Sequence, residues 1–365
     1  MSYEVVYQNK YYLRELIESI KLKDSLDQIS YQAEIRLKVS NDFPDIQPGQ
    51  DIRISGVPYG KTGLVYLLNP GVVWECDSSD KSTKHMDLTI YDRTIYLAKS
   101  EDEYLLPAGQ TASQRLRKYA SDWGIKLSTI PDTKTKLKKA VYRARPIYSM
   151  ITADLQETVK SGGDMYIPRM TTTGLELFKV GSNKEVWVLQ GIEETEQKRT
   201  LEGTITKVKV IGTEDRKEKP KKSKAGTQDE LGRVYGGKVD KKTKGTGKKP
   251  KVKTDSKVEL PSKILAITTG QTAKYGTLQR MVQDEDVKTT AAAQKLGKSM
   301  LSGVQETFTV KCLDLNTIRA GDAVMFNNIR LIVTAVNHDL GDPGHMVAEL
   351  ASEDYVRRRF FLKYA

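Results

Sequence analysis

The sequence predicts a mainly β protein with an α+β middle domain, in which one antiparallel β unit is built twice. Three observations predict this fold class: apolar and polar residues alternate near both ends of the chain, the middle has a helical period, and paired motifs recur in the same order. The 365 residues exceed one ordinary hydrophobic core. We therefore expect domains at 1–105, 106–190 and 191–365, with a basic loop inserted at 213–258.

The first hundred residues are expected to form strands. Residues 31–39 alternate between apolar and polar or charged side chains, which is the period of a half-buried antiparallel strand. Pro48-Gly49 then predicts a turn into a short alternating strand at 51–54. Further strand-like runs occupy 64–68, 72–76 and 86–91. We therefore expect the first domain to be all β.

The middle of the chain changes to a helical period. Thr111-Ala112-Ser113-Gln114 fits a capping box at a helix start, and Gly124 stands where a left-handed cap would end that helix. A second helix is expected from Pro146 to Gly162, and a hairpin with Gly174 at its turn should follow. After residue 190 strands return, with an alternating run at 204–211. The expected apolar stripes are Ile147, Ile151, Leu155 and Val159 in the second helix, and Ala292, Leu296 and Met300 in a last helix at 286–302.

Two parts of the chain share the same motifs in the same order. The alternating run at 31–39 corresponds to 304–312, and each run is followed by a glycine turn and then by a His-Met pair. Order and spacing together indicate one antiparallel unit built twice, with a glycine for the tight turn of each. The repeat positions are Ile46, Gly49, Ile52, Ile54, His85 and Met86 in the first unit, and Ile318, Gly321, Val324, Phe326, His345 and Met346 in the second.

The net charge of +12 is concentrated in one segment. Residues 213–258 hold sixteen Lys or Arg and seven Asp or Glu, a net +9, which leaves the remaining chain near balance. A solvated lysine loop, a loop that contacts a protein partner and a nucleic-acid-binding loop all fit this composition. A single aromatic residue, Tyr235, gives few stacking platforms for single strands. The candidate contact residues are Lys221, Lys222, Lys224, Lys241, Lys242, Lys248 and Lys249.

Motifs that carry chemistry are incomplete in this sequence. The run 56–62 resembles a phosphate-binding loop, but it is one residue short between its glycines and contains a proline. Cys76 and Cys312 are far apart and are expected to be free thiols, while the three histidines are expected to pack or to form hydrogen bonds. We therefore expect no catalytic, cofactor or metal site. The first residues lack a signal-peptide pattern, and no apolar run is long enough to cross a bilayer.

The order of these features resembles a known family. A strand-rich domain, a two-helix middle and a second strand-rich domain close in Ile318-Arg319-Ala320-Gly321-Asp322-Ala323-Val324, Val336-Asn337-His338-Asp339-Leu340 and His345-Met346. This pattern resembles the XkdQ-type baseplate hub proteins, which are similar to the late-control protein D hubs of contractile-tailed phages and to the hubs of phage-tail-like particles. The resemblance covers the chain apart from the basic loop.

The resemblance implies two tail-tube-like antiparallel β-barrel domains per chain, in a homotrimer that forms a pseudo-six-fold ring. Such a ring adapts a six-fold tail tube to a three-fold central spike, so the chain is expected to be structural and not an enzyme. The expected partners are further copies, tail tube or tube-initiator proteins, the spike and baseplate wedge proteins, with the tape-measure protein as a further candidate. The expected location is the baseplate of a virion or phage-tail-like particle assembled in the bacterial cytoplasm. A nucleic-acid-binding protein using the loop at 213–258 is the alternative.

Overall fold

The computed structural model describes residues 3–39, 43, 45–80, 84–212, 263–284 and 287–362. The chain forms two compact units, one made of Met1–Gly203 with Val304–Ala365 and the other of Thr204–Gly303. The basic loop at 213–258, with its seven candidate contact lysines, lies outside the described residues. The three-domain division at 1–105, 106–190 and 191–365 stays a prediction.

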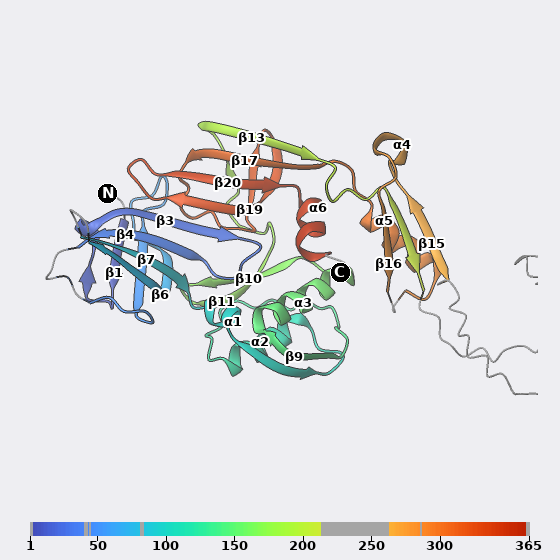
Figure 1. The fold of residues 1–365 in the computed structure, drawn as a ribbon, viewed down its shortest axis with the longest axis horizontal. Helices are drawn as coiled ribbons and strands as arrows, with labels where there is room; N and C mark the ends of the chain where they lie inside the picture. Colours follow the sequence, from blue (N-terminus) through green and yellow to red (C-terminus); the bar gives the residue numbers. More distant parts are fainter. Residues whose placement is uncertain are drawn as a thin grey trace, which may run out of the picture. The chain divides into compact units, whose positions relative to one another are not determined.

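The first unit is organised around a 13-stranded sheet. Its order is β13-β17-β20-β19-β3-β4-β7-β6-β5-β1-β2, with β18 beside β19 and β12 beside β18 (Figure 1). The strands before the middle segment are β1 Tyr3–Tyr7, β2 Tyr11–Tyr12, β3 Ile17–Ser25, β4 Gln32–Lys38, β5 Asp51–Gly56, β6 Val65–Asp80 and β7 Lys84–Asp92. Those after it are β12 Trp187–Val188, β13 Ile192–Thr200, β17 Gln305–Leu313, β18 Ala323–Phe326, β19 Ile329–Asp339 and β20 His345–Ala351.

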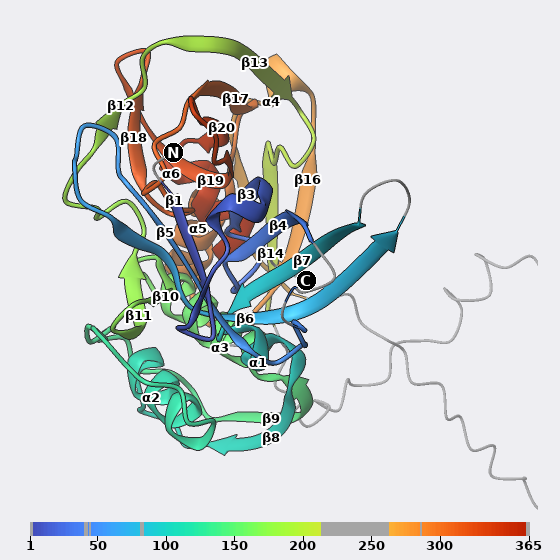
Figure 2. The ribbon, with the colours of Figure 1, turned by 90° about the vertical axis from the view of Figure 1, so that its left-hand side faces the viewer.

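This sheet confirms the predicted, mainly antiparallel β class. Strands from both ends of the chain share one sheet because β19 pairs with β3. The strand pairings among the described residues do not close either half into a separate barrel. The runs expected as separate strands at 64–68 and 72–76 are one strand, β6, which pairs with β5 along its first part and with β7 along its second. Figure 2 shows the far ends of β6 and β7 as a hairpin that extends away from β5.

Alternation along the strands separates core from surface in both halves. In β4, Ala33, Ile35 and Leu37 are buried, and their β7 partners at the same face are buried as well. The corresponding face of β17 and β20 builds a second core, which includes the buried free thiol of Cys312. The other free thiol, Cys76, is half-buried beside the first core.

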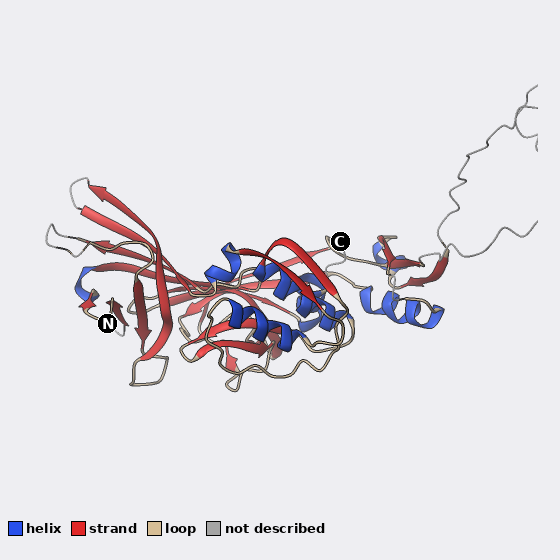
Figure 3. Ribbon diagram, turned by 90° about the horizontal axis from the view of Figure 1, so that it is seen from below, coloured by secondary structure: helices blue, strands red, loops and turns tan. Residues whose placement is uncertain are grey.

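The middle segment carries the two longest helices of the first unit, α2 and α3, and Figure 3 shows the helices of the molecule in blue. The predicted capping box is confirmed, since Thr111 accepts from the Gln114 backbone and the Gln114 side chain accepts from Thr111. The predicted stripe of the second helix is buried, and that helix begins directly after Pro146. The elements are α1 Ile95–Lys99, β8 Glu101–Leu106, α2 Ala112–Asp122, β9 Ala140–Pro146, α3 Ile147–Lys160, β10 Tyr166–Thr171 and β11 Gly174–Lys179. Short helices elsewhere in the unit are Arg14–Leu16, α6 Glu353–Val356 and a π-helix at Arg357–Phe361.

The second unit is a small sheet with one packed helix. β14 Lys207–Ile211 pairs antiparallel with β15 Ile264–Thr269 and parallel with β16 Gln279–Gln283. α4 spans Thr272–Tyr275 and α5 spans Thr290–Met300. The expected stripe of α5 is partly wrong: Met300 is buried, but Ala292 is exposed. Ala293 and Gly297 are buried instead, because this face of the helix packs against β14 and β15.

A buried ion pair organises the middle segment. The Asp154 carboxylate accepts from Nη1 of Arg115 at 2.6 Å and from the hydroxyls of Tyr119 and Tyr142 at 3.0 Å each. Burial raises the pKa of Asp154, while the Arg115 guanidinium acts to lower it. Removal of one partner leaves an uncompensated charge inside the protein.

We predict that Asp154→Ala lowers the free energy of unfolding by about 3–5 kcal/mol, because the Arg115 guanidinium loses its counter-charge in the interior. Denaturant titration measures the loss. The matched control is Glu103→Ala, which removes an exposed partner of Arg143 at 3.7 Å. This change should cost at most about 1 kcal/mol. Equal losses for the two variants would contradict the role given to the buried pair.

Candidate assembly interface

The large sheet contains the same five-stranded arrangement twice. In the first arrangement β3 pairs with β4, β4 with β7, β7 with β6 and β6 with β5. In the second, β13 pairs with β17, β17 with β20, β20 with β19 and β19 with β18. We call these the first and second repeat. All eight pairings are antiparallel, so the repeats match in strand order and direction.

Two irregularities recur at matching places in both repeats, whereas the two register shifts between β5 and β6 have no counterpart between β18 and β19. The register shifts between Val73 and Glu75 where β6 meets β7, and between Val333 and Ala335 where β19 meets β20. A second shift lies at the start of β3 and recurs at the start of β13. Bulges change the local twist and bend of a strand. Their recurrence indicates that the two repeats bend alike at these two places.

The two turn glycines have the same conformation. Gly49 and Gly321 each have a φ of 90°, a region that favours glycine. The Gly49 N–H donates to the Val73 carbonyl at 2.7 Å, and the Gly321 N–H donates to the Val333 carbonyl at 2.8 Å. The apolar repeat positions around them are buried: Ile46, Ile52, Ile54 and Met86 in the first repeat, and Ile318, Val324, Phe326 and Met346 in the second.

Each His-Met pair lies near the start of its strand, close to a glutamate at a bulge of a neighbouring strand. Nδ1 of His85 lies 3.1 Å from Oε2 of Glu18, and Nδ1 of His345 lies 2.7 Å from Oε1 of Glu193. Both glutamates follow the first residue of their strand, in β3 and in β13. The third histidine, His338, is buried on β19 and bonds Asp314 at 2.6 Å and the Ile318 carbonyl at 3.0 Å. His338 therefore forms hydrogen bonds, as predicted, while His85 and His345 lie within ion-pair distance of glutamates.

The strand register corrects one correspondence expected from sequence. Leu37 pairs with Met86, and Cys312 pairs with Met346, so Cys312 corresponds to Leu37 and not to Val39. The expected alignment of 31–39 with 304–312 is therefore displaced by two residues. A displacement of two keeps every side chain on the same face, which is why alternation alone did not detect it.

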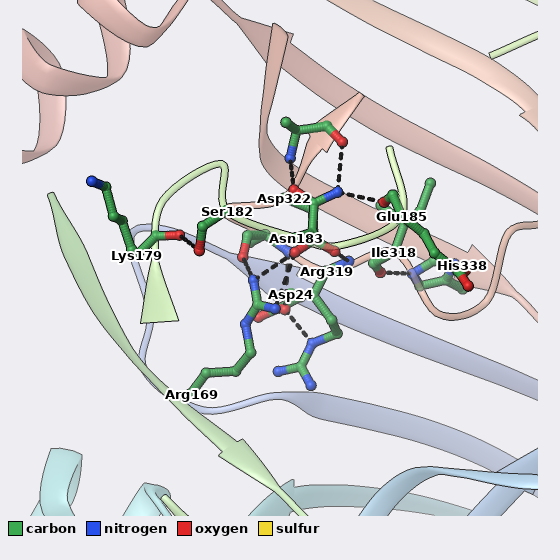
Figure 4. Close-up of polar contacts among 12 residues, drawn as sticks. Asp24, Arg169, Lys179, Ser182, Asn183, Glu185, Ile318, Arg319, Asp322 and His338 are labelled. Carbon is green, nitrogen blue, oxygen red and sulfur yellow. Dashed lines mark hydrogen bonds and ion pairs between the residues drawn. The ribbon is translucent and has the colours of Figure 1, made fainter. Parts of the chain in front are cut away.

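The repeats meet where β3 lies against β19. Val336 pairs with Asp24 and His338 pairs with Leu22 in this antiparallel junction. The buried Asp24 carboxylate accepts from Nε of Arg319 and from the Ala320 N–H, the latter at 3.1 Å. Figure 4 shows Asp24 and Arg319 facing each other, close to Ile318 and Asp322 of the same turn. A strand of the first repeat thus holds the turn of the second.

Arg319 and Arg169 extend this contact. The Arg319 guanidinium lies 3.7 Å from the ring centroid of Tyr31. Burial lowers the pKa of Arg319, but Asp24 and Tyr31 outweigh it and raise the value above its usual range. Arg169 of β10 donates to Asp322 Oδ1 from both terminal nitrogens, at 3.1 Å each (Figure 4). The middle segment is therefore tied to the same turn.

Each repeat has one edge without a strand partner among the described pairings: residues 75–79 of β6 in the first repeat and the outer side of β13 in the second. β13 pairs with β17 along one edge only, and it lies at the end of the sheet. Residues 75–79 of β6 pair with β7, while β5 reaches only to Val72, which lies opposite its first residue, Asp51. Unpaired edges present backbone donors and acceptors to another strand. The two free edges occupy the positions that β3 and β19 use to join the repeats.

The described part of the chain holds no group of three or more His, Cys, Asp or Glu side chains placed to bind a metal ion. None of its helices combines the length and the apolar character that crossing a membrane requires. Sequence reasoning did not identify Asp24, Arg169 or Arg319 as junction residues. These three charged residues lie in strands and turns whose local sequence carries no motif. Only the strand pairing brings them together.

We predict that Gly321→Ala destabilises the protein more than Gly49→Ala. Both substitutions place a side chain at a φ of 90°, which costs about 1–2 kcal/mol. A Cβ at Gly321 would also lie 2.6 Å from Cδ1 of Ile167, whereas a Cβ at Gly49 meets nothing within 4 Å. This crowding adds about 1–3 kcal/mol. Melting temperatures of the two variants compare the losses, and equal losses would contradict the prediction.

Asp92 should give the protein a specific pH dependence. Burial raises its pKa from 3.8 to about 6. Because the folded state retains this proton longer than the unfolded state, the contribution to stability is full below about pH 4. It falls as the pH rises through 6, by up to roughly 3 kcal/mol. Asp92→Asn should flatten this part of the stability profile, measured by thermal melts from pH 4.5 to 7. An unchanged slope would contradict the assignment.

The fold is similar to those of solved tail proteins. The 43 kDa tail protein of prophage MuSo2 from Shewanella oneidensis is 12% identical with a TM-score of 0.65, covering 97% of this chain and 99% of that chain. The tail protein from Neisseria meningitidis MC58 is 11% identical with a TM-score of 0.61, covering 97% of each chain.

A component of the E. coli type VI secretion system, which exhibits structural similarity to T4 bacteriophage tail proteins gp27 and gp5, has 7% identity and a TM-score of 0.51. This match covers 93% of our chain and 74% of that one. The chain thus has the fold of phage tail proteins, as the resemblance implied. No curated protein matches it by sequence. The family model described as YQBQ-like matches residues 20–237, more than half of the sequence, and the chain therefore belongs to the YQBQ-like family.

Proposed function

We propose that this protein is a structural, non-enzymatic hub of the baseplate in a contractile phage tail or phage-tail-like particle. It acts as a homotrimer that adapts a six-fold tail tube to a three-fold central spike. The observation that carries the proposal is the repeated five-stranded arrangement, with the same pairing order and with two bulges at matching places in both copies.

The symmetry argument follows from this repetition. A ring of three chains with two matching repeats each presents six similar surfaces, although its true symmetry is three-fold. One face can then meet six identical tube subunits while another meets three identical spike subunits. A chain with a single repeat would lack this property. The bulges are important here, because two repeats that bend differently would present unlike surfaces to the tube.

The similar solved structures support the same role. Two of them are tail proteins that match almost over the full length of both chains. A third is described as similar to the tail proteins gp27 and gp5 of T4, in a secretion system component. The partners that we propose are the tail tube or tube initiator, the spike, the baseplate wedges and the tape-measure protein. The place of action is the virion or tail-like particle, after assembly in the host cytoplasm.

No observation on the described residues favours the nucleic-acid alternative, since the lysine-rich loop at 213–258 lies outside them. The polar clusters that the structure describes join strands and turns, and each is explained by packing.

We predict that the purified full-length chain forms a trimer with large permanent interfaces, of about 2,000 Å² or more. Sedimentation equilibrium at several protein concentrations measures the mass, and electron microscopy of the sample should show rings with six similar lobes. A chain that remains monomeric at high concentration and does not enter tail particles would overturn the hub proposal. The basic loop offers a control, because its deletion should leave the trimer intact.

A further inference from the structure

We propose that the trimer is closed by strand pairing: β13 of one copy lies antiparallel against residues 75–79 of β6 in the next copy. The inference rests on the proposed trimer and specifies its contact. Each chain then contributes one free edge from each repeat, so the interface is head to tail. Contacts of this type close into rings when the rotation between copies allows it.

The template for this contact is the junction inside the chain. β19 of the second repeat pairs with β3 of the first, in a register that sets Asn337 opposite Lys23. The equivalent of β19 is β6, and the equivalent of β3 is β13. The same junction between copies therefore needs a β6 edge and a β13 edge, and both of these edges lack a strand partner in the described pairings.

The template also fixes the register between copies. His85 and His345 are 260 residues apart, and so are Val73 and Val333, which places Asp77 at the position of Asn337. Ile17 corresponds to Ile192 at a separation of 175 residues, which places Lys198 at the position of Lys23. Asp77 of one copy should therefore lie opposite Lys198 of the next. The other outward pairs are Glu75 with Thr200 and Ser79 with Glu196.

The chemistry of the two edges suits this register. Asp77 meets a lysine, and Glu75 lies diagonal to the same lysine, so the acidic side chains of β6 face a basic one. A shift by two residues would set Asp77 against Glu196 and cost repulsion. On the inward face, Cys76 would lie beside Arg199, and Ser78 would lie beside Gln197. In the chain's own junction the corresponding pairs are Val336 with Asp24 and His338 with Leu22.

The hydrogen-bond pattern identifies which pair to cross-link. Leu340 N–H donates to Ile20 O, and Leu26 N–H donates to Thr334 O, both at 2.9 Å. Pairs alternate between bonded and non-bonded along an antiparallel ladder, so Asn337 and Lys23 form a non-bonded pair. The Cα atoms of such pairs are about 4.5 Å apart, within the range of a disulfide. The same spacing is expected for Asp77 and Lys198 between copies.

The test uses the full-length chain in a Cys76→Ser background with Asp77→Cys and Lys198→Cys. After mild oxidation, a non-reducing denaturing gel should show covalent dimers and trimers and no longer ladder, because a closed ring has three seams. The control with the register displaced combines Asp77→Cys with Glu196→Cys, and at least about tenfold less cross-linking is expected there, since diagonal Cα atoms lie about 7–8 Å apart. Asn337→Cys with Lys23→Cys is the positive control and should cross-link within one chain.

The outcomes separate this inference from the proposed function. A trimer that cross-links only through Asp77→Cys and Lys198→Cys supports the seam. A trimer of normal mass that does not cross-link, or that cross-links equally in the displaced control, overturns the seam and leaves the hub proposal standing. In that case the charges of β13 protect a free edge against aggregation. A chain that stays monomeric in sedimentation overturns both.

Discussion

The pairing of β3 with β19 is the contact on which the architecture depends, because it makes one sheet of two repeats. Register is the weak point of such a junction, since a slip by one residue would turn every side chain of β3 to the opposite face. Asp24 resists this slip. Its carboxylate is buried against Arg319 and the Ala320 N–H, and a slipped strand would bury this charge without a partner.

The same turn also anchors the middle segment. Arg169 reaches Asp322 and the Ala320 carbonyl from β10, and its guanidinium lies 3.9 Å from the ring centroid of Phe178. The turn before Gly321 therefore receives contacts from β3 and from β10. In the first repeat the corresponding turn carries Gln47 and Gln50, and the Gln47 N–H donates to the side-chain oxygen of Gln50. The turns of the two repeats thus have the same backbone conformation, but their side chains contact different neighbours.

Much of the fold could be predicted from local chemistry. Alternation identified β4, β5 and β7, and the capping box at Thr111 identified the start of α2, because these signals depend on neighbouring residues. The junction could not be predicted in this way. Asp24 and Arg319 are almost 300 residues apart, and each is an unremarkable charge until strand pairing brings them together. The buried face of α5 was predicted wrongly for a related reason. The face with Ala292 and the face with Ala293 and Gly297 both contain small residues, and only the contact with the sheet determines which of them is buried.

The connections between strands differ more than the strands themselves. β18 and β19 are joined by Asn327 and Asn328, both with positive φ, in the tightest kind of hairpin turn. β5 and β6 are joined by residues 57–64, in which Tyr59 and Leu64 are exposed. In the proposed ring the short and long connections would alternate around the circumference. A binding partner that contacts only the strands would find six similar sites around the ring, whereas a partner that contacts the long connections would find three.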